Sequence, residues 1–137
     1  MTKQKKYLLP ENEIPTQWYN IMADMPNKPL PPIHPQTHKP LTWQDLAHIF
    51  PEECSKQELD MEHEWIDIPE EVLDKYRFYR STPLVRAYEL EKALGTPAHI
   101  YFKNESVNPL GSHKINSALP QCYYANLFCN ATATTET

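Results

Sequence analysis

Residues 108–118 read Asn108-Pro109-Leu110-Gly111-Ser112-His113-Lys114-Ile115-Asn116-Ser117-Ala118, and the fold prediction depends most on this stretch. Asn-Pro is a turn-forming pair, and Gly111 permits a backbone conformation that other residues rarely adopt. Ser112 is a favourable N-cap residue, so a helix is predicted to follow it with Lys114 in the first turn. The stretch therefore predicts a tight loop that leads into a helix.

The position of Lys114 has a chemical consequence. Backbone N–H groups give the start of a helix a positive partial charge, which disfavours an ammonium group there. The neutral amine is the form that attacks a carbonyl carbon, and the N–H groups of the same turn bind phosphate. An amine beside a phosphate site is what pyridoxal phosphate requires. The alternative interpretation is a solvated lysine with no chemical role.

Residues 111–118 resemble the lysine segment of the tryptophan synthase beta family, and other stretches resemble the same family in the same order. Residues 7–10 and 14–20 are similar to the N-terminal extension of its second type of beta chain. Residues 80–87 are similar to the entry of its catalytic fold, and residues 134–137 to the start of its Thr-Glu-Thr-Gly-Ala-Gly-Gln loop. The resemblance covers nearly the whole chain, although the family's members are several times longer.

This resemblance implies an α/β fold, namely the N-terminal part of a pyridoxal-phosphate enzyme of fold type II. An irregular, proline-rich and helical extension over residues 1–80 would precede the start of the cofactor-binding domain over residues 81–137. The implied activity is that of a lyase in tryptophan biosynthesis, which joins L-serine and indole with the cofactor as electron sink. The implied partners are a second copy in a homodimer and a tryptophan synthase alpha chain.

The resemblance also assigns roles to five residues. Lys114 would carry the cofactor covalently and move protons. His113 would lie near the cofactor phosphate, and Asn116 near the cofactor's ring oxygen. Glu136 would be the catalytic carboxylate, and Thr137 would open the loop that binds the substrate carboxylate.

Two features depart from the family pattern. Residues 126–133 lack the family's charged, glycine-containing turn, although Asn130 could take the left-handed conformation of the missing glycine. Gly95 and Gly111 are the only glycines in the chain, so the later glycine-rich phosphate loop is absent, as is the residue that faces the pyridine nitrogen. We therefore expect a truncated and inactive N-terminal portion. The alternatives are a β-replacing or dehydrating enzyme similar to threonine synthase or serine dehydratase, and a non-catalytic remnant.

Composition narrows the classes of function. The 137 residues predict one small domain, and a net charge of −5 does not favour nucleic-acid binding, which calls for a basic face. No apolar run approaches the ~18–20 residues of a membrane span or follows the N-terminal lysines as in a signal peptide, so the expected location is the cytoplasm. Cys54, Cys122 and Cys129 form no C-x-x-C pair and predict neither a disulfide framework nor a zinc site.

Capping residues, prolines and apolar spacing predict the remaining elements. Prolines make residues 1–40 an extended arm, in which His34 and His38 have the spacing of helical metal ligands but Pro35 argues against the helix. Pro120 is expected to kink the last helix. The predicted helices span residues 42–50, 52–59, 69–79, 89–94 and 113–128, and the predicted strands span residues 84–88, 98–103 and 131–137.

Overall fold

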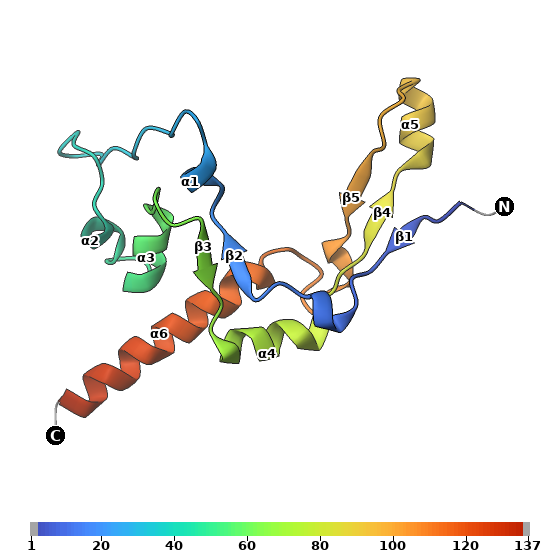
Figure 1. Cartoon of the computed structure of the whole chain (residues 1–137). Coiled ribbons are helices and arrows are strands. Elements are labelled where there is room, and N and C mark those ends of the chain that lie inside the picture. The colour runs from blue at the N-terminus through green and yellow to red at the C-terminus, as the bar shows by residue number, and fades with distance from the viewer. Residues whose placement is uncertain (1–2, 136–137) are drawn as a thin grey trace.

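Two small antiparallel sheets are joined through a pair of packed helices. The computed structural model describes residues 3–135, with side chains described for residues 3–127. One sheet has three strands in the order β1 (Lys6–Tyr7), β4 (Leu84–Arg86) and β5 (Tyr101–Lys103), and the other pairs β2 (Gln17–Tyr19) with β3 (Trp65–Asp67). In Figure 1 the three-stranded sheet and α5 (Tyr88–Leu94) stand to one side, and β2, β3 and the first helices to the other. Helix α4 (Glu70–Tyr79) and the start of α6 (Ile115–Thr135) lie between them.

The three-stranded sheet combines residues from both halves of the chain. β4 (Leu84–Arg86) pairs antiparallel with β5 (Tyr101–Lys103) on one side and with β1 (Lys6–Tyr7) on the other. Val85 lies opposite Phe102 in one pairing and opposite Lys6 in the other. The strands predicted over residues 84–88 and 98–103 are thus confirmed in a shorter form, and the N-terminal arm contributes an edge strand that was not predicted.

Helix α5 (Tyr88–Leu94) is fixed to this sheet by one charged pair. Glu91 accepts hydrogen bonds from the Arg86 guanidinium at 2.9 Å and from the Ile100 N–H at 2.8 Å, so it contacts the segments on both sides of the helix. The Arg86 guanidinium lowers the pKa of Glu91 below its usual range. Gly95 ends the helix with a φ of 59°, directly after the predicted span of residues 89–94.

The buried core lies on one face of α4 (Glu70–Tyr79), which follows β3 (Trp65–Asp67). Val72, Leu73 and Tyr76 recur at helical spacing and are almost fully buried. Leu119 and Tyr123 from α6 pack against them. Trp18 from β2 (Gln17–Tyr19) covers the same cluster. The predicted helix over residues 69–79 is confirmed, with Pro69 at the N-cap.

Three further short helices belong to the N-terminal half: α1 (Ile21–Asp24), α2 (Trp43–Leu46) and α3 (Glu52–Glu58). Thr42 and Asp45 form a reciprocal capping box at the start of α2. The helix predicted over residues 42–50 is shorter than expected, because the chain turns after Leu46. A 3-10 turn, η1 (Glu11–Glu13), precedes β2.

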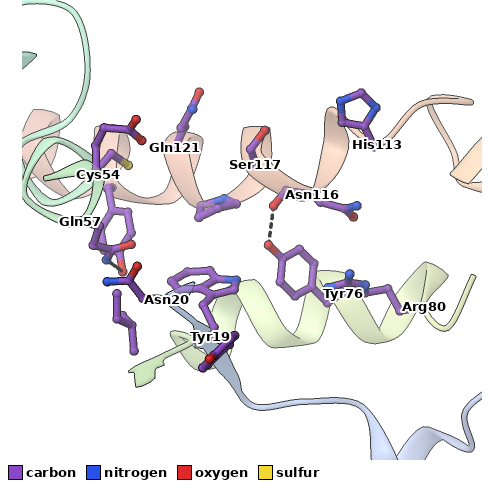
Figure 2. Close-up of a pocket in the computed structure, with 15 residues that line it drawn as sticks. Tyr19, Asn20, Cys54, Gln57, Tyr76, Arg80, His113, Asn116, Ser117 and Gln121 are labelled. Atoms are coloured by element: carbon purple, nitrogen blue, oxygen red, sulfur yellow. Dashed lines mark hydrogen bonds between the residues drawn. The ribbon is translucent and has the colours of Figure 1, made fainter. Parts of the chain in front are cut away.

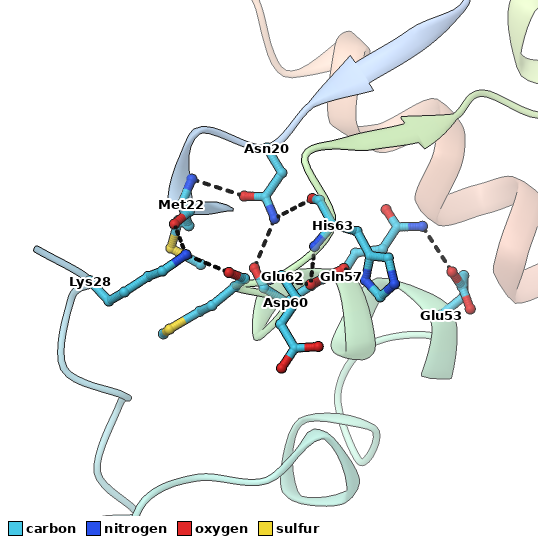
Figure 3. Close-up of polar contacts among 9 residues, drawn as sticks. Asn20, Met22, Lys28, Glu53, Gln57, Asp60, Glu62 and His63 are labelled. Carbon is cyan, nitrogen blue, oxygen red and sulfur yellow. Dashed lines mark hydrogen bonds and ion pairs between the residues drawn. The ribbon is translucent and has the colours of Figure 1, made fainter. Parts of the chain in front are cut away.

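The proline-rich arm is fastened to the segment before β3 by backbone carbonyls, as Figure 3 shows. The Asn20 amide donates to the carbonyls of Asp60 at 2.8 Å and His63 at 3.1 Å. The Lys28 ammonium donates to three carbonyls at 2.6–2.8 Å, those of Met22, Ala23 and Met61. Although its helices are short, the arm therefore has a defined path between residues 20 and 28.

The C-terminal part differs from the prediction. Helix α6 spans Ile115–Thr135, so the predicted strand over residues 131–137 is wrong as far as residue 135. Asn130 lies inside the helix and does not take the predicted left-handed conformation. Ala131 and Ala133 favour a helix, and extending an existing helix requires no new nucleus, which outweighs the strand preference of the threonines.

Pro120 lies inside α6, and the helix continues on both sides of it. Proline has no N–H to donate to the carbonyl four residues earlier, which is that of Asn116. The Tyr76 hydroxyl donates a hydrogen bond to that carbonyl instead. A side chain of α4 thus satisfies the group that Pro120 leaves without its helical partner, and the same contact joins the two helices.

Candidate functional site

The loop before α6 is built around the side chain of Asn108. Its Oδ1 accepts hydrogen bonds from the N–H groups of Leu110 at 3.1 Å and Ser112 at 3.2 Å. Its Nδ2 donates to the Ser112 carbonyl at 2.8 Å, and its own carbonyl accepts from the Gly111 N–H at 3.0 Å. Gly111 has a φ of 62°, which confirms the predicted use of a glycine there. The side-chain amide of Asn108 therefore holds the backbone of residues 108–112 in a closed loop.

Lys114 lies immediately before α6 and not in its first turn as predicted. Its carbonyl accepts hydrogen bonds from the N–H groups of Ser117 and Ala118, and Ser112 Oγ accepts from the Lys114 N–H at 3.4 Å. The Asn108 side chain is hydrogen-bonded to both the N–H and the carbonyl of Ser112. These bonds keep Ser112 in the loop, so the helix begins after it. The Lys114 side chain is exposed at this junction.

Asn116 faces protein groups at both ends of its side chain. Oδ1 accepts from the Tyr79 hydroxyl at 2.8 Å, and Nδ2 donates to Glu105 at 3.3 Å. Burial raises the pKa of Tyr79 to about 12, so its hydroxyl stays protonated and able to donate. The predicted contact of Asn116 with a cofactor ring oxygen would require its amide to exchange one of these partners.

A groove of about 550 Å³ runs along α6 and is bordered by β2, β3, α3 and α4. His113 and Asn116 line it, whereas Lys114 does not, so the groove holds two of the three predicted site residues that the structure describes. Figure 2 shows Arg80 beside Tyr76 in this groove, with the guanidinium 4.8 Å from the centre of the Tyr76 ring.

Two predicted site residues, Glu136 and Thr137, lie outside the described residues. The described part ends in the helix that contains Thr134 and Thr135, so the strand that was to present Glu136 has no counterpart there.

Among the side chains of residues 3–127, no group of three or more His, Cys, Asp or Glu is placed to hold a metal ion. His34 Nδ1 accepts from the Gln36 and Thr37 N–H groups. None of the helices within residues 3–135 has the length and apolar character needed to cross a membrane.

Comparison with known proteins gives a consistent set of relatives, although no protein-family model matches the chain. The chain is 51% identical over 133 residues to tryptophan synthase beta chain 2 of Aquifex aeolicus (strain VF5), which covers 97% of this chain and 30% of that protein. It is 47% identical over 135 residues to tryptophan synthase beta chain 2 of Methanosarcina acetivorans, which covers 98% of this chain and 30% of the relative. It is 51% identical over 121 residues to the tryptophan synthase beta chain of Thermococcus gammatolerans, with coverages of 88% and 27%.

This chain is homologous to part of the tryptophan synthase beta chain. The resemblance inferred from residues 111–118 is thereby confirmed. The chain spans about 30% of the length of the beta chains it matches first. Its mixed helices and strands agree with the α/β fold expected for the N-terminal part of a tryptophan synthase beta chain.

The residues at the loop fit pyridoxal phosphate in part. A primary amine at Lys114 and an imidazole at His113 lie side by side and exposed at a fixed loop–helix junction. These are groups suited to an aldehyde and a phosphate respectively. The amide of Asn116 is bonded within the protein and does not add to the fit.

Sequence reasoning missed the residues that support the loop, which are Thr82, Glu105 and Asn108. Glu105 is the acceptor for side chains of both Thr82 and Asn108. The one local signal was the Asn-Pro pair, which predicted a turn but not the side-chain hydrogen bonds that hold it.

Proposed function

We propose that this chain carries the lysine-bearing part of a pyridoxal-phosphate-dependent lyase that joins L-serine and indole to give L-tryptophan and water. The observation that supports it most is the rigid loop of residues 108–112, which ends at an exposed lysine in a chain about half identical to tryptophan synthase beta chains. When bound, the cofactor would supply an electron sink for chemistry at the substrate's carbon atoms.

The described residues would act as follows. Lys114 Nζ would hold the cofactor by a covalent bond and would afterwards carry a proton to and from the substrate. The His113 imidazole would donate to the cofactor phosphate. Because hydrogen bonds from Asn108 already order the loop of residues 108–112, the side chains of Lys114 and His113 would be held in place before the cofactor binds.

Other parts of the proposal concern residues and partners beyond the described structure. Glu136 is proposed as the carboxylate that assists proton transfer, and Thr137 as the start of the segment that binds the substrate carboxylate. A homodimer, a tryptophan synthase alpha chain as partner and a cytoplasmic location are proposed from the same family relationship.

Cofactor titration of the purified chain tests the proposal. Pyridoxal phosphate should give the absorbance band of a covalently bound cofactor, and Lys114→Ala should abolish it. Lys92→Ala is the matched control, because Lys92 is an exposed lysine on α5 away from the loop. A band that survives Lys114→Ala, or that Lys92→Ala reduces equally, would contradict the assignment.

A further inference from the structure

Glu105 joins three segments that are separate in the sequence. It lies in the 3-10 turn η2 (Glu105–Val107), and one of its oxygens, Oε1, accepts from the Thr82 hydroxyl at 2.7 Å. The other oxygen, Oε2, accepts from the amides of Asn108 at 3.2 Å and Asn116 at 3.3 Å. Thr82 is 2% exposed and Asn108 is 6% exposed, so water does not readily replace these bonds.

The two amides lie on either side of the lysine. Asn108 is hydrogen-bonded to Ser112, which lies two residues before Lys114, and Asn116 lies two residues after Lys114. Asn116 is also held by the Tyr79 hydroxyl of α4. One carboxylate therefore fixes the backbone before and after Lys114, while the lysine side chain itself stays exposed and free to react.

Side-chain charge supports the same arrangement. Burial raises the pKa of Glu105, but the hydrogen bonds from Thr82, Asn108 and Asn116 outweigh it and hold the pKa below its ordinary value. Because all three partners are neutral donors, an ionised carboxylate can accept from all of them at once, whereas a neutral amide could not.

We propose that Glu105 is the positioning residue of the lysine site, and that through Asn108 and Asn116 it holds His113 and Lys114 in the geometry that receives the cofactor. The inference rests on the proposed function where it concerns the cofactor, but the order of the loop can be measured in the absence of cofactor. Glu105 acts through its neighbours and contacts neither substrate nor cofactor in this arrangement.

The test uses four variants of the 137-residue chain. Glu105→Gln replaces one of the two acceptor oxygens by a donor, so position 105 cannot accept from Thr82, Asn108 and Asn116 together. Asn108→Asp places a carboxylate against the carboxylate of Glu105 and also removes the donor to the Ser112 carbonyl. The double variant exchanges the acid and the amide, so the bond between positions 105 and 108 can form again with reversed polarity, while the bond to the Ser112 carbonyl stays lost. Glu89→Gln, an exposed carboxylate on α5, is the control.

Two readouts separate the loop from the chemistry. The first is hydrogen exchange at the amides of Leu110 and Ser112, which Asn108 protects. The second is the rate at which pyridoxal phosphate, trapped with borohydride, labels Lys114 compared with the other lysines. Circular dichroism establishes that each variant keeps its helices.

We expect both single variants to exchange the loop amides at least about tenfold faster and to lose the preference for Lys114, since a buried polar mismatch costs about that factor or more. The double variant should exchange the loop amides more slowly than Asn108→Asp alone without full recovery, because the bond to the Ser112 carbonyl stays lost, and Glu89→Gln should change neither property. Unchanged exchange and labelling in Glu105→Gln would overturn the role of Glu105. Absence of preferential Lys114 labelling in the unaltered chain, with the loop amides still protected, would instead contradict the cofactor assignment alone.

Discussion

The residues proposed to bind the cofactor differ sharply in exposure from those that support their loop. Lys114 and His113 are exposed, whereas Thr82 and Asn108, which support their loop, are buried. Glu105 lies half-buried and accepts hydrogen bonds from the side chains of Thr82, Asn108 and Asn116. The chemistry proposed for Lys114 thus depends on Thr82, Asn108 and Glu105, which are not among the residues proposed to contact the cofactor.

Glu105→Gln should make stability less sensitive to acid. Burial raises the pKa of Glu105, yet its three donors and Lys103 leave it below the ordinary value. A carboxyl group with a folded pKa below its unfolded value of about 4.3 stabilises the fold fully above that pH, and the contribution is lost as the pH falls through the folded pKa.

The measurement is the free energy of unfolding in urea from neutral pH to about pH 3.5. The unaltered chain should lose stability more steeply below about pH 5 than the variant, because only the former has this carboxyl group to protonate. Glu89→Gln should follow the unaltered chain. Parallel curves for Glu105→Gln and the unaltered chain would contradict the expectation.

At the scale of elements, the contact between α4 and α6 replaces a hydrogen bond that Pro120 cannot make. Tyr76→Phe should remove the donor to the Asn116 carbonyl and cost about 1–2 kcal/mol of the free energy of unfolding. The cost should be smaller when Pro120→Ala is also present, because alanine supplies an N–H at the helical position. A double-mutant cycle by urea unfolding measures this coupling, and strict additivity of the two changes would contradict it.

The end of α5 provides a second prediction. Gly95 has a φ of 59°, and a Cβ there would meet no atom within 4 Å, so the cost of a side chain is conformational alone. Gly95→Ala should lower the free energy of unfolding by about 1 kcal/mol, and Gly95→Asn by less, because asparagine tolerates the left-handed region better. Thermal unfolding of the two variants decides it, and an equal or inverted order would show that conformation is not the cause.

Local signals explain which elements the sequence predicted. The helix end at Gly95, the helix start at Thr42 and the turn at Gly111 depend on a few neighbouring residues, so the local sequence was sufficient to find them. The strand over residues 131–137 failed because threonine's preference for strands depends on neighbouring strands, and the described part of the chain offers none beside α6. Glu105 was missed because Thr82, 23 residues earlier, becomes its partner only in the folded chain.

At the scale of the whole molecule, the chain buries less of its surface than a compact monomer of the same mass would. Its accessible area is 10491 Å², whereas a compact monomer of its 16.0 kDa mass would expose about 7,400 Å². The principal apolar cluster consists of Ile68, Val72, Leu73 and Tyr76. Large apolar side chains are exposed on several elements, among them Leu30, Ile49, Phe78, Leu94, Phe102 and Leu110.

We therefore expect the 137-residue chain alone to bind a hydrophobic dye, to have a low free energy of unfolding and to form no tryptophan from L-serine and indole. The reason is that so small a core stabilises only part of the structure, while the exposed apolar groups remain open to other surfaces. Dye fluorescence, calorimetry and an assay for tryptophan measure these properties. Steady formation of tryptophan by the purified chain would contradict this expectation.

The most direct test of the account is to locate the cofactor on the chain. The purified protein is incubated with pyridoxal phosphate, reduced with borohydride, digested and mapped by mass spectrometry. If the loop of residues 108–112 presents Lys114 as proposed, the adduct should be found predominantly on Lys114, approaching one per chain. An adduct spread over the exposed lysines in proportion to their accessibility, or concentrated on a different lysine, would contradict the account.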